Sequence, residues 1–226
     1  MASATGSLPT TIEPTLDREV AAWSEARLLI GVDEVGRGPL AGPVVAAAIV
    51  FPAHTRAVAG VRDSKTLSAL QRASLVPELR GRAAGIGLGA ASPREIDRLN
   101  IRVATALAMR RAINRVWRLL SIRDPLETTC RILIDGLPLP ELGLPHQALV
   151  DGDALCYSIA AAGVIAKEIR DDLMHRLGRL HPRYGWGTNV GYATSEHCAA
   201  LAAFGPSPHH RRSFAPVVQI PLFGSY

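Results

Sequence analysis

The chain has 226 residues, of which 48% are hydrophobic and 20% are charged. That apolar content is enough for a folded core, and it excludes a chain that is disordered or fibrous throughout. The 25 basic and 20 acidic residues give a formal net charge of +5, which allows a polyanionic partner without requiring one. Only Lys65 and Lys167 are lysines, which a codon preference for arginine explains most simply. The alternative is that these two positions need a compact ammonium group rather than a guanidinium.

The composition shows no sign of export or membrane insertion. The first twenty residues lack both a basic opening and an apolar stretch, so they do not resemble a secretory signal. The longest apolar run, 40–51, is too short to span a bilayer. Cys130, Cys156 and Cys198 lack the spacing of zinc ligands and are expected to be free thiols. We therefore expect a cytoplasmic protein without membrane contact.

Short apolar runs alternate with helical patterns along the chain, which is typical of an α/β fold. Residues 1–25 contain few large apolar groups and are expected to form a flexible tail. Strands are predicted over 27–35, 44–51 and 83–90, the first two as a hairpin, and a helix is predicted over 68–80. Two later strands are predicted to end at Asp135 and Asp151, and a helix is predicted over 158–180.

One long helix is predicted after Ser92. Pro93 stands at its first position and Glu95 follows the cap by three residues, which is a capping-box pattern. Apolar residues then recur at helical spacing as far as Leu120. The segment 94–123 carries eight arginines against two acidic residues. We interpret this charge as a solvated helix face, with a nucleic-acid contact surface as the alternative.

Carboxylates follow three of the predicted strands. Asp33 and Glu34 follow LLIGV, Asp135 follows RILI, and Asp151 and Asp153 follow QALV. If these strands share one sheet, their carboxylates can converge in one acidic pocket. Adjacent strand residues point to opposite faces, so the first pair shares a face only if the strand bends, as the following glycines would permit.

Several carboxylates in one partly desolvated site repel one another, and a hard divalent cation is the simplest way to neutralise them. Oxygen ligands without histidine or cysteine favour Mg²⁺ or Mn²⁺ over zinc. In a basic protein such a cluster indicates phosphodiester chemistry, in which two ions about 4 Å apart activate a water and stabilise the leaving oxygen. The alternative is that each aspartate caps a helix or a turn.

The glycine-rich turn GRGPLAG is not a P-loop, because no Lys-Ser or Lys-Thr follows it. The segment GIGLG at 85–89 has the wrong spacing for a dinucleotide-binding fingerprint. Gly36 and Gly38 expose backbone amides that can approach a sugar closely, and Arg37 between them offers a fork for a phosphate.

The segment 31–50, GVDEVGRGPLAGPVVAAAIV, closely resembles the signature of the ribonuclease HII family. The resemblance continues through DSKTLS (63–68), EIDRLNI (95–101), LIDG (133–136), DGDA (151–154), IAKEIRD (165–171), GYAT (191–194) and GPSPHHRRSF (205–214). It implies an RNase H-like α/β fold, with a central mixed β-sheet flanked by helices and a small helical C-terminal region. A single catalytic domain is then expected over 26–226, with 193–226 as its C-terminal helical or extended region.

The same resemblance implies roles for individual residues. The metal-binding and catalytic carboxylates of the family are matched by Asp33, Glu34, Asp135 and Asp153. Gly36, Arg37 and Gly38 match the loop that reads a ribose 2′-hydroxyl, and Tyr192 matches the tyrosine that stacks on the sugar. The implied activity, with Mn²⁺ or Mg²⁺, is cleavage of RNA–DNA hybrids and of single ribonucleotides in duplex DNA, leaving 5′-phosphate and 3′-hydroxyl ends.

Other residues receive weaker interpretations. The chain departs from the family pattern at Asp151, Ala154, Gly163 and Val190, and we hypothesise that Asp151 adds charge near the site without binding metal. Lys65 is predicted to contact a substrate phosphate and Lys167 to pair with a nearby acid. For His209 and His210 we expect a phosphate contact or a structural hydrogen bond.

Two other functions compatible with these motifs are a non-catalytic hybrid-binding module and a metal phosphatase acting on small phosphoesters. The expected partners are RNA–DNA hybrids and ribonucleotide-containing duplex DNA, bound by a monomer. A DNA-clamp partner is left open. The apolar C-terminal stretch is expected to pack on the domain, with binding of another protein as the alternative.

Overall fold

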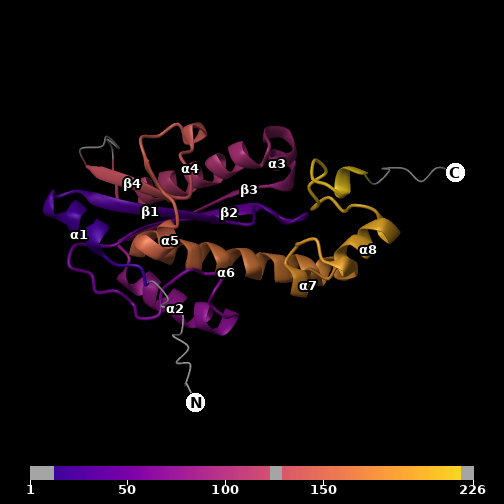
Figure 1. Ribbon diagram of the computed structural model, residues 1–226, viewed down its shortest axis with the longest axis horizontal. Helices are drawn as coiled ribbons and strands as arrows, with labels where there is room; N and C mark the ends of the chain where they lie inside the picture. Colours follow the sequence, from indigo (N-terminus) through magenta and orange to yellow (C-terminus); the bar gives the residue numbers. More distant parts are fainter. Residues whose placement is uncertain (1–12, 123–128, 220–226) are drawn as a thin grey trace, which may run out of the picture.

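The computed structural model describes residues 13–122 and 129–219. They form a five-stranded sheet with helices on both faces (Figure 1). The elements in chain order are α1 (Asp17–Ser24), β1 (Leu28–Val35), β2 (Val44–Val50), α2 (Ala69–Arg82), β3 (Gly85–Ala91), α3 (Pro93–Leu99), α4 (Ile101–Leu119), β4 (Cys130–Asp135), η1 (Pro140–Leu142), β5 (Gln147–Leu149), α5 (Gly152–Leu155), α6 (Tyr157–Leu180), η2 (Pro182–Tyr184), α7 (Trp186–Asn189), α8 (Ser195–Phe204) and η3 (Val217–Gln219). The predicted α/β class is confirmed.

The sheet is mixed, with the strand order β3-β2-β1-β4-β5. Strands β1 and β2 form the predicted antiparallel hairpin, whereas β1, β4 and β5 run parallel to one another. The carboxyl ends of these three strands therefore meet at one edge of the sheet. The strand predicted to end at Asp151 ends instead at Leu149, because Asp151 adopts a left-handed conformation (φ 52°) in the turn before α5.

Apolar layers cover the sheet on both sides. Helix α4 packs against one face, and α6 together with α2 packs against the other (Figure 1). Strand β2 is buried along its whole length, as a central strand between two layers should be. The three cysteines are free, as expected. Within 13–122 and 129–219, no helix is long and apolar enough to cross a membrane.

The predicted flexible tail is wrong for residues 17–24, which form helix α1. Glu19 of this helix is only 1% exposed. Its Oε1 accepts hydrogen bonds from the Ser158 amide (2.7 Å) and the Cys156 thiol (3.3 Å) at the start of α6. A carboxylate at this position accepts a hydrogen bond from a free N–H group of the first helical turn, and its charge is stabilised by the positive end of the helix dipole. Residues 1–12 of the predicted tail lie outside the described residues.

The long helix predicted after Ser92 is two helices. The capping box of Ser92 and Glu95 is present, but α3 ends at Leu99 and α4 begins at Ile101. Between them Asn100 has a positive φ of 67°, and its side chain accepts hydrogen bonds from the amides of Arg102 (2.9 Å) and Val103 (3.1 Å). The apolar spacing continues across this junction, so periodicity alone does not reveal the break.

Replacing Asn100 tests this cap. Asn100→Ala removes the acceptor for the first turn of α4 and leaves alanine at a positive φ, so the free energy of unfolding should fall by about 1–2 kcal/mol. Asn100→Asp keeps the acceptor and should stay within about 0.5 kcal/mol of the wild type. Urea unfolding followed by circular dichroism measures both, and an alanine variant as stable as the aspartate variant would contradict the assignment.

Candidate functional site

The parallel strands bring Asp33 and Asp135 to the same edge of the sheet. The register of β1 and β4 pairs Val32 with Ile134, so these aspartates are the next residue on each strand. Asp153 comes from α5, whose first residue, Gly152, donates its amide to Asp135 Oδ1 at 2.8 Å. Three segments that are far apart in the sequence thus meet at one edge, as predicted.

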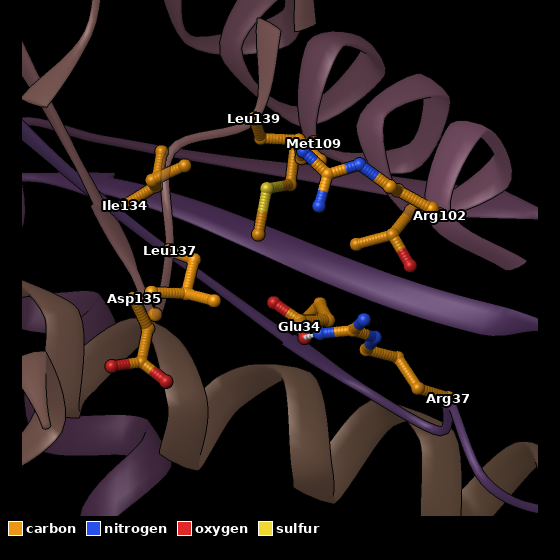
Figure 2. A pocket seen from close by; sticks show the side chains of 10 residues that line it. Glu34, Arg37, Arg102, Met109, Ile134, Asp135, Leu137 and Leu139 are labelled. Atoms are coloured by element: carbon orange, nitrogen blue, oxygen red, sulfur yellow. Dashed lines mark hydrogen bonds and ion pairs between the residues drawn. The ribbon is translucent and has the colours of Figure 1, made fainter. Parts of the chain in front are cut away.

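Asp33 and Glu34 lie on opposite sides of β1. Asp33 is 7% exposed and faces α6, where its carboxylate occupies the space that a Cβ atom on Gly163 would need. Glu34 faces α4 and lines a cavity of about 200 Å³ beside Arg102 and Met109 (Figure 2). Strand β1 continues to Val35, so the chain turns only after both carboxylates and the alternation of the strand is kept.

The electrostatics of this edge favour protonated carboxyl groups. Burial, reinforced by repulsion from Glu34 and Asp135, raises the pKa of Asp33 well above its ordinary value. Burial also raises the pKa of Glu34 to about 7, although Arg37, whose Nη1 is 3.4 Å from Glu34 Oε1, opposes the shift. Burial and the charges of Asp135 and Asp63 raise the pKa of Asp153 to about 6. Without a cation, these groups hold protons more tightly than free carboxylates do.

Asp63, which is not among the predicted site residues, belongs to the same cluster. It shares a hydrogen bond with Asp153 that helps to raise the pKa of that aspartate. Asp63 Oδ1 also accepts a hydrogen bond from the backbone amide of Lys65 at 2.9 Å. The predicted carboxylates come directly after apolar strands, whereas Asp63 lies in the loop before α2. The DSKTLS motif was the only signal that could have found it.

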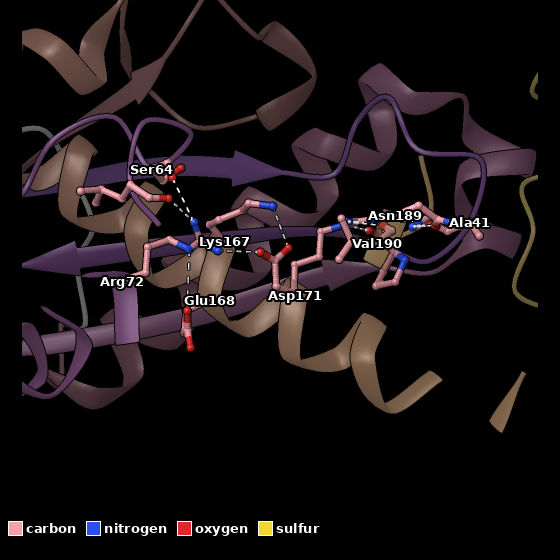
Figure 3. Close-up of polar contacts among 12 residues, drawn as sticks. Ala41, Ser64, Arg72, Lys167, Glu168, Asp171, Asn189 and Val190 are labelled. Atoms are coloured by element: carbon pink, nitrogen blue, oxygen red, sulfur yellow. Dashed lines mark hydrogen bonds and ion pairs between the residues drawn. The ribbon is translucent and has the colours of Figure 1, made fainter. Parts of the chain in front are cut away.

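The two lysines have different surroundings. Burial alone would lower the pKa of Lys65, but the charges of Asp63, Asp33 and Asp153 raise it. The Lys65 ammonium is therefore part of the acidic edge. Lys167 Nζ instead forms an ion pair with Asp171 Oδ1 at 2.8 Å on α6, as predicted (Figure 3).

The glycine-rich turn and Tyr192 lie side by side. Gly36 has a φ of 95°, a conformation that side chains other than glycine rarely adopt. A Cβ atom on Gly38 would lie 3.8 Å from Tyr192 Cε1. The Tyr192 side chain is 44% exposed, so its ring is accessible to a ligand beside the turn. The structure thus brings together the two elements that the family resemblance assigns to one sugar.

The donor set at the acidic edge suits Mg²⁺ or Mn²⁺, because every candidate ligand is a carboxylate oxygen. Across residues 13–122 and 129–219, however, no group of three or more His, Cys, Asp or Glu side chains is arranged as a ready-made metal site. The geometry gives the reason. Asp33 and Glu34 diverge across β1, and Asp135 Oδ1 accepts a backbone amide.

The remaining candidates have structural partners. His210 is 1% exposed; its Nδ1 accepts the Ser207 amide and its Nε2 lies 2.9 Å from His197 Nε2. The predicted structural hydrogen bond is therefore confirmed for His210. On the basic helical segment, Arg111 pairs with Glu95 and Arg102 with Glu141.

Comparison with known proteins decides the family. The model of the ribonuclease HII family matches residues 30–217. The chain belongs to the ribonuclease HII family. The ribonuclease HII of a Synechococcus strain is 50% identical to it, over 95% of this chain and 94% of the relative. That of Herpetosiphon aurantiacus is also 50% identical, over 89% and 96%. Membership in the ribonuclease HII family makes the chain an endoribonuclease, a hydrolase of phosphodiester bonds.

Solved structures support the ribonuclease H fold. Ribonuclease H2 from Pyrococcus horikoshii superposes with a TM-score of 0.64 at 23% identity, covering 85% of this chain and 96% of that one. Bst-RNase HIII in complex with Mn²⁺ gives a TM-score of 0.67 at 20% identity, covering 86% and 69%. At these identities the likeness concerns the fold alone, and the predicted RNase H-like architecture is confirmed.

The raised pKa values predict how stability depends on pH. Unfolded carboxyl groups titrate near pH 4. The folded groups titrate higher, at about 7 for Glu34 and about 6 for Asp153, so the stability that they contribute is present below pH 4 and is lost as the pH rises toward 7. The free energy of unfolding of the metal-free protein should therefore fall by roughly 1–3 kcal/mol between pH 4.5 and pH 8.

Thermal and urea unfolding in EDTA across this pH range provide the measurement. Glu34→Gln should reduce the fall, whereas Glu13→Gln, which changes an exposed glutamate before α1, should leave it unchanged. A wild-type protein that gains stability between pH 4.5 and pH 8 would show that the acidic edge is not under this repulsion.

Proposed function

We propose that the chain hydrolyses the RNA strand of RNA–DNA hybrids and cuts at single ribonucleotides embedded in duplex DNA. The observation that carries the proposal is the juxtaposition of Tyr192 with Gly38 on the loop that directly follows Asp33 and Glu34. The ring can pack against a ribose while the exposed backbone amides donate to its hydroxyl group. The neighbouring carboxylates can bind the metal ions that phosphodiester hydrolysis needs.

Metal-dependent hydrolysis requires several of the carboxylates to act together. Asp33, Glu34, Asp135 and Asp153 would hold Mn²⁺ or Mg²⁺, which supplies an activated water and stabilises the leaving 3′ oxygen. The residues that surround them have separate tasks. Asp63 orients Asp153 through their shared hydrogen bond, and Lys65 offers an ammonium to a substrate phosphate at the same edge. The 5′-phosphate and 3′-hydroxyl products follow from attack on phosphorus with departure of the 3′ oxygen.

Recognition of the ribonucleotide rests on the turn after β1. Among the described residues, the amides of Gly36, Arg37 and Gly38 donate no hydrogen bond, so they are available to a ligand. A 2′-hydroxyl can accept from such an amide, whereas the deoxyribose of DNA offers no oxygen at that position. The Tyr192 ring would pack against the same sugar. A phosphatase for small phosphoesters needs neither feature, and a non-catalytic binding module has no use for the carboxylates.

A duplex with one ribonucleotide tests the activity. The wild type should cut it with Mg²⁺ or Mn²⁺ and leave the all-DNA duplex of the same sequence intact. Asp135→Asn should lower the rate by about a thousandfold or more, because it removes a ligand charge that the transition state needs. The matched control is Asp151→Asn, because Asp151 is exposed and its side chain caps no helix.

For Asp151→Asn we expect a rate within about threefold of the wild type, a factor worth less than 1 kcal/mol. Equal cutting of both duplexes by the wild type would reject the substrate assignment. Equal losses in the two variants would reject the distinction between Asp135 and Asp151.

The lysine at the acidic edge has its own test. Lys65→Arg keeps the charge but replaces a compact ammonium with a larger planar group, so kcat/KM should fall by about tenfold, or 1.4 kcal/mol. Lys167→Arg is the matched control, because that lysine pairs with Asp171 on α6. Steady-state cleavage of the single-ribonucleotide duplex compares the two variants. A Lys65→Arg enzyme with an unchanged kcat/KM would mean that neither lysine has a special role.

A sliding clamp is a further proposed partner. One similar structure, the PCNA:RNase HII complex from Archaeoglobus fulgidus, has a TM-score of 0.64 at 23% identity and covers 83% of this chain and 95% of that one. In this chain the apolar stretch VVQIPLFGSY at 217–226 lies mostly outside the described residues, and we propose it as the segment that such a clamp would bind. Co-elution with a clamp that is lost when 220–226 are deleted would support this assignment.

A further inference from the structure

Two loops must keep their relative positions if a ribose is to be read by both. The first, here called the reader loop, comprises residues 36–43 between β1 and β2. The second, here called the tyrosine loop, comprises residues 190–192 directly after α7. They contact each other directly, since the Leu40 amide donates to the Gly191 carbonyl at 2.8 Å.

Arg211 binds the reader loop from inside the protein. The residue is fully buried, and its guanidinium donates to the carbonyls of Gly42 (3.0 Å), Arg37 (2.8 Å) and Gly36 (2.5 Å). In a trans peptide the C=O and the next N–H point in opposite directions. Holding the carbonyls of Gly36 and Arg37 inward therefore directs the amides of Arg37 and Gly38 away from Arg211.

Arg170 joins the two loops. This buried residue of α6 donates to the carbonyls of Pro43 (3.1 Å) and Ala41 (3.2 Å) in the reader loop. Its Nη1 donates to the Val190 carbonyl in the tyrosine loop at 3.0 Å (Figure 3). The Arg170 side chain also fills the space in which a Cβ atom on Gly36 would lie. One guanidinium thus spans the junction between the loop amides and Tyr192.

Neither guanidinium is held by an acid. Within the described residues, every hydrogen bond from these two side chains goes to a main-chain carbonyl, and Arg211 additionally lies over the Phe214 ring at 5.1 Å. A buried charge without a carboxylate partner is costly. A planar guanidinium can donate to three carbonyls in fixed directions. The ammonium of lysine is a point charge and cannot reproduce this geometry.

We propose that Arg170 and Arg211 are positioning residues that set the preference for a ribonucleotide over a deoxyribonucleotide. Arg211 aims the amides of the reader loop at the 2′-hydroxyl, and Arg170 sets the spacing between those amides and the ring of Tyr192. The proposal rests on the proposed function, because it assumes that this loop pair reads a ribose.

The test uses Arg170→Lys and Arg211→Lys in the full chain. The matched control is Arg82→Lys, because Arg82 also donates to two loop carbonyls, those of Arg56 (2.8 Å) and Ala57 (3.0 Å). That loop follows β2 at the end of the sheet opposite the acidic edge. For each enzyme, one Mg²⁺ assay gives KM for the single-ribonucleotide duplex and the inhibition constant Ki of the all-DNA duplex. Thermal unfolding monitors the fold.

In both positioning variants the ratio of Ki to KM should be about tenfold lower than in the wild type. The Ki of the all-DNA duplex should stay within about twofold of the wild-type value, because a displaced amide loses a hydrogen bond only to the ribose. Arg82→Lys should keep the wild-type ratio. If both folded arginine variants keep that ratio, or if KM and Ki rise together, the residues are merely structural and the proposal fails.

If one variant does not fold, the other decides. Hydrogen exchange supplies a further measure, since amide exchange in 36–43 should rise in the positioning variants and remain unchanged in Arg82→Lys. The outcome for the wild type separates the two hypotheses. If the wild type has equal KM and Ki, the proposed recognition of the ribose is rejected. If the preference for the ribonucleotide duplex survives both substitutions, only the proposed role of Arg170 and Arg211 is rejected.

Discussion

Mutual repulsion among carboxylates at one sheet edge is the constraint on which the site depends. The parallel order of β1, β4 and β5 forces Asp33 and Asp135 together, and α5 adds Asp153. Lys65 and Arg37 offset part of the negative charge, yet the pKa values of Asp33, Glu34 and Asp153 remain raised. A divalent cation at this edge would neutralise that repulsion, which is why we propose that the carboxylates bind one.

The same edge needs loops held at definite positions, and buried arginines hold them. Arg170 and Arg211 bind the carbonyls around Gly36 and Val190. Arg72 does the same for the segment of Lys65, donating to the carbonyls of Ser64 (3.4 Å) and Leu67 (2.6 Å) while pairing with Asp171 (Figure 3). The arginines of this chain, whose charge allows a polyanionic partner, thus also hold loops in the interior of the site.

Sequence patterns predicted the parts of this structure that depend on local order. The ends of apolar strands pointed to Asp33, Asp135 and Asp153, and the parallel order of β1, β4 and β5 brings them to one edge of the sheet. They could not locate Asp63, which lies in a loop. Nor could they show that Asn100 interrupts a periodic helix, or that Glu19 is buried against α6, since both depend on contacts that apolar spacing does not record. The tertiary roles of Arg170 and Arg211 were equally invisible, because a buried arginine and a surface arginine look alike in a sequence.

A crystal structure of the inactive Asp135→Asn variant with a single-ribonucleotide duplex and Mg²⁺ would show whether the acidic edge and the loop of residues 36–43 bind the same ribonucleotide. We expect the phosphate to be cut to lie at the edge formed by Asp33, Glu34 and Asp153. We also expect the 2′-hydroxyl to lie within hydrogen-bonding distance of the Arg37 or Gly38 amide, with the Tyr192 ring against the sugar. A ribonucleotide bound away from the loop of residues 36–43, or a phosphate remote from the carboxylates, would contradict the proposed function.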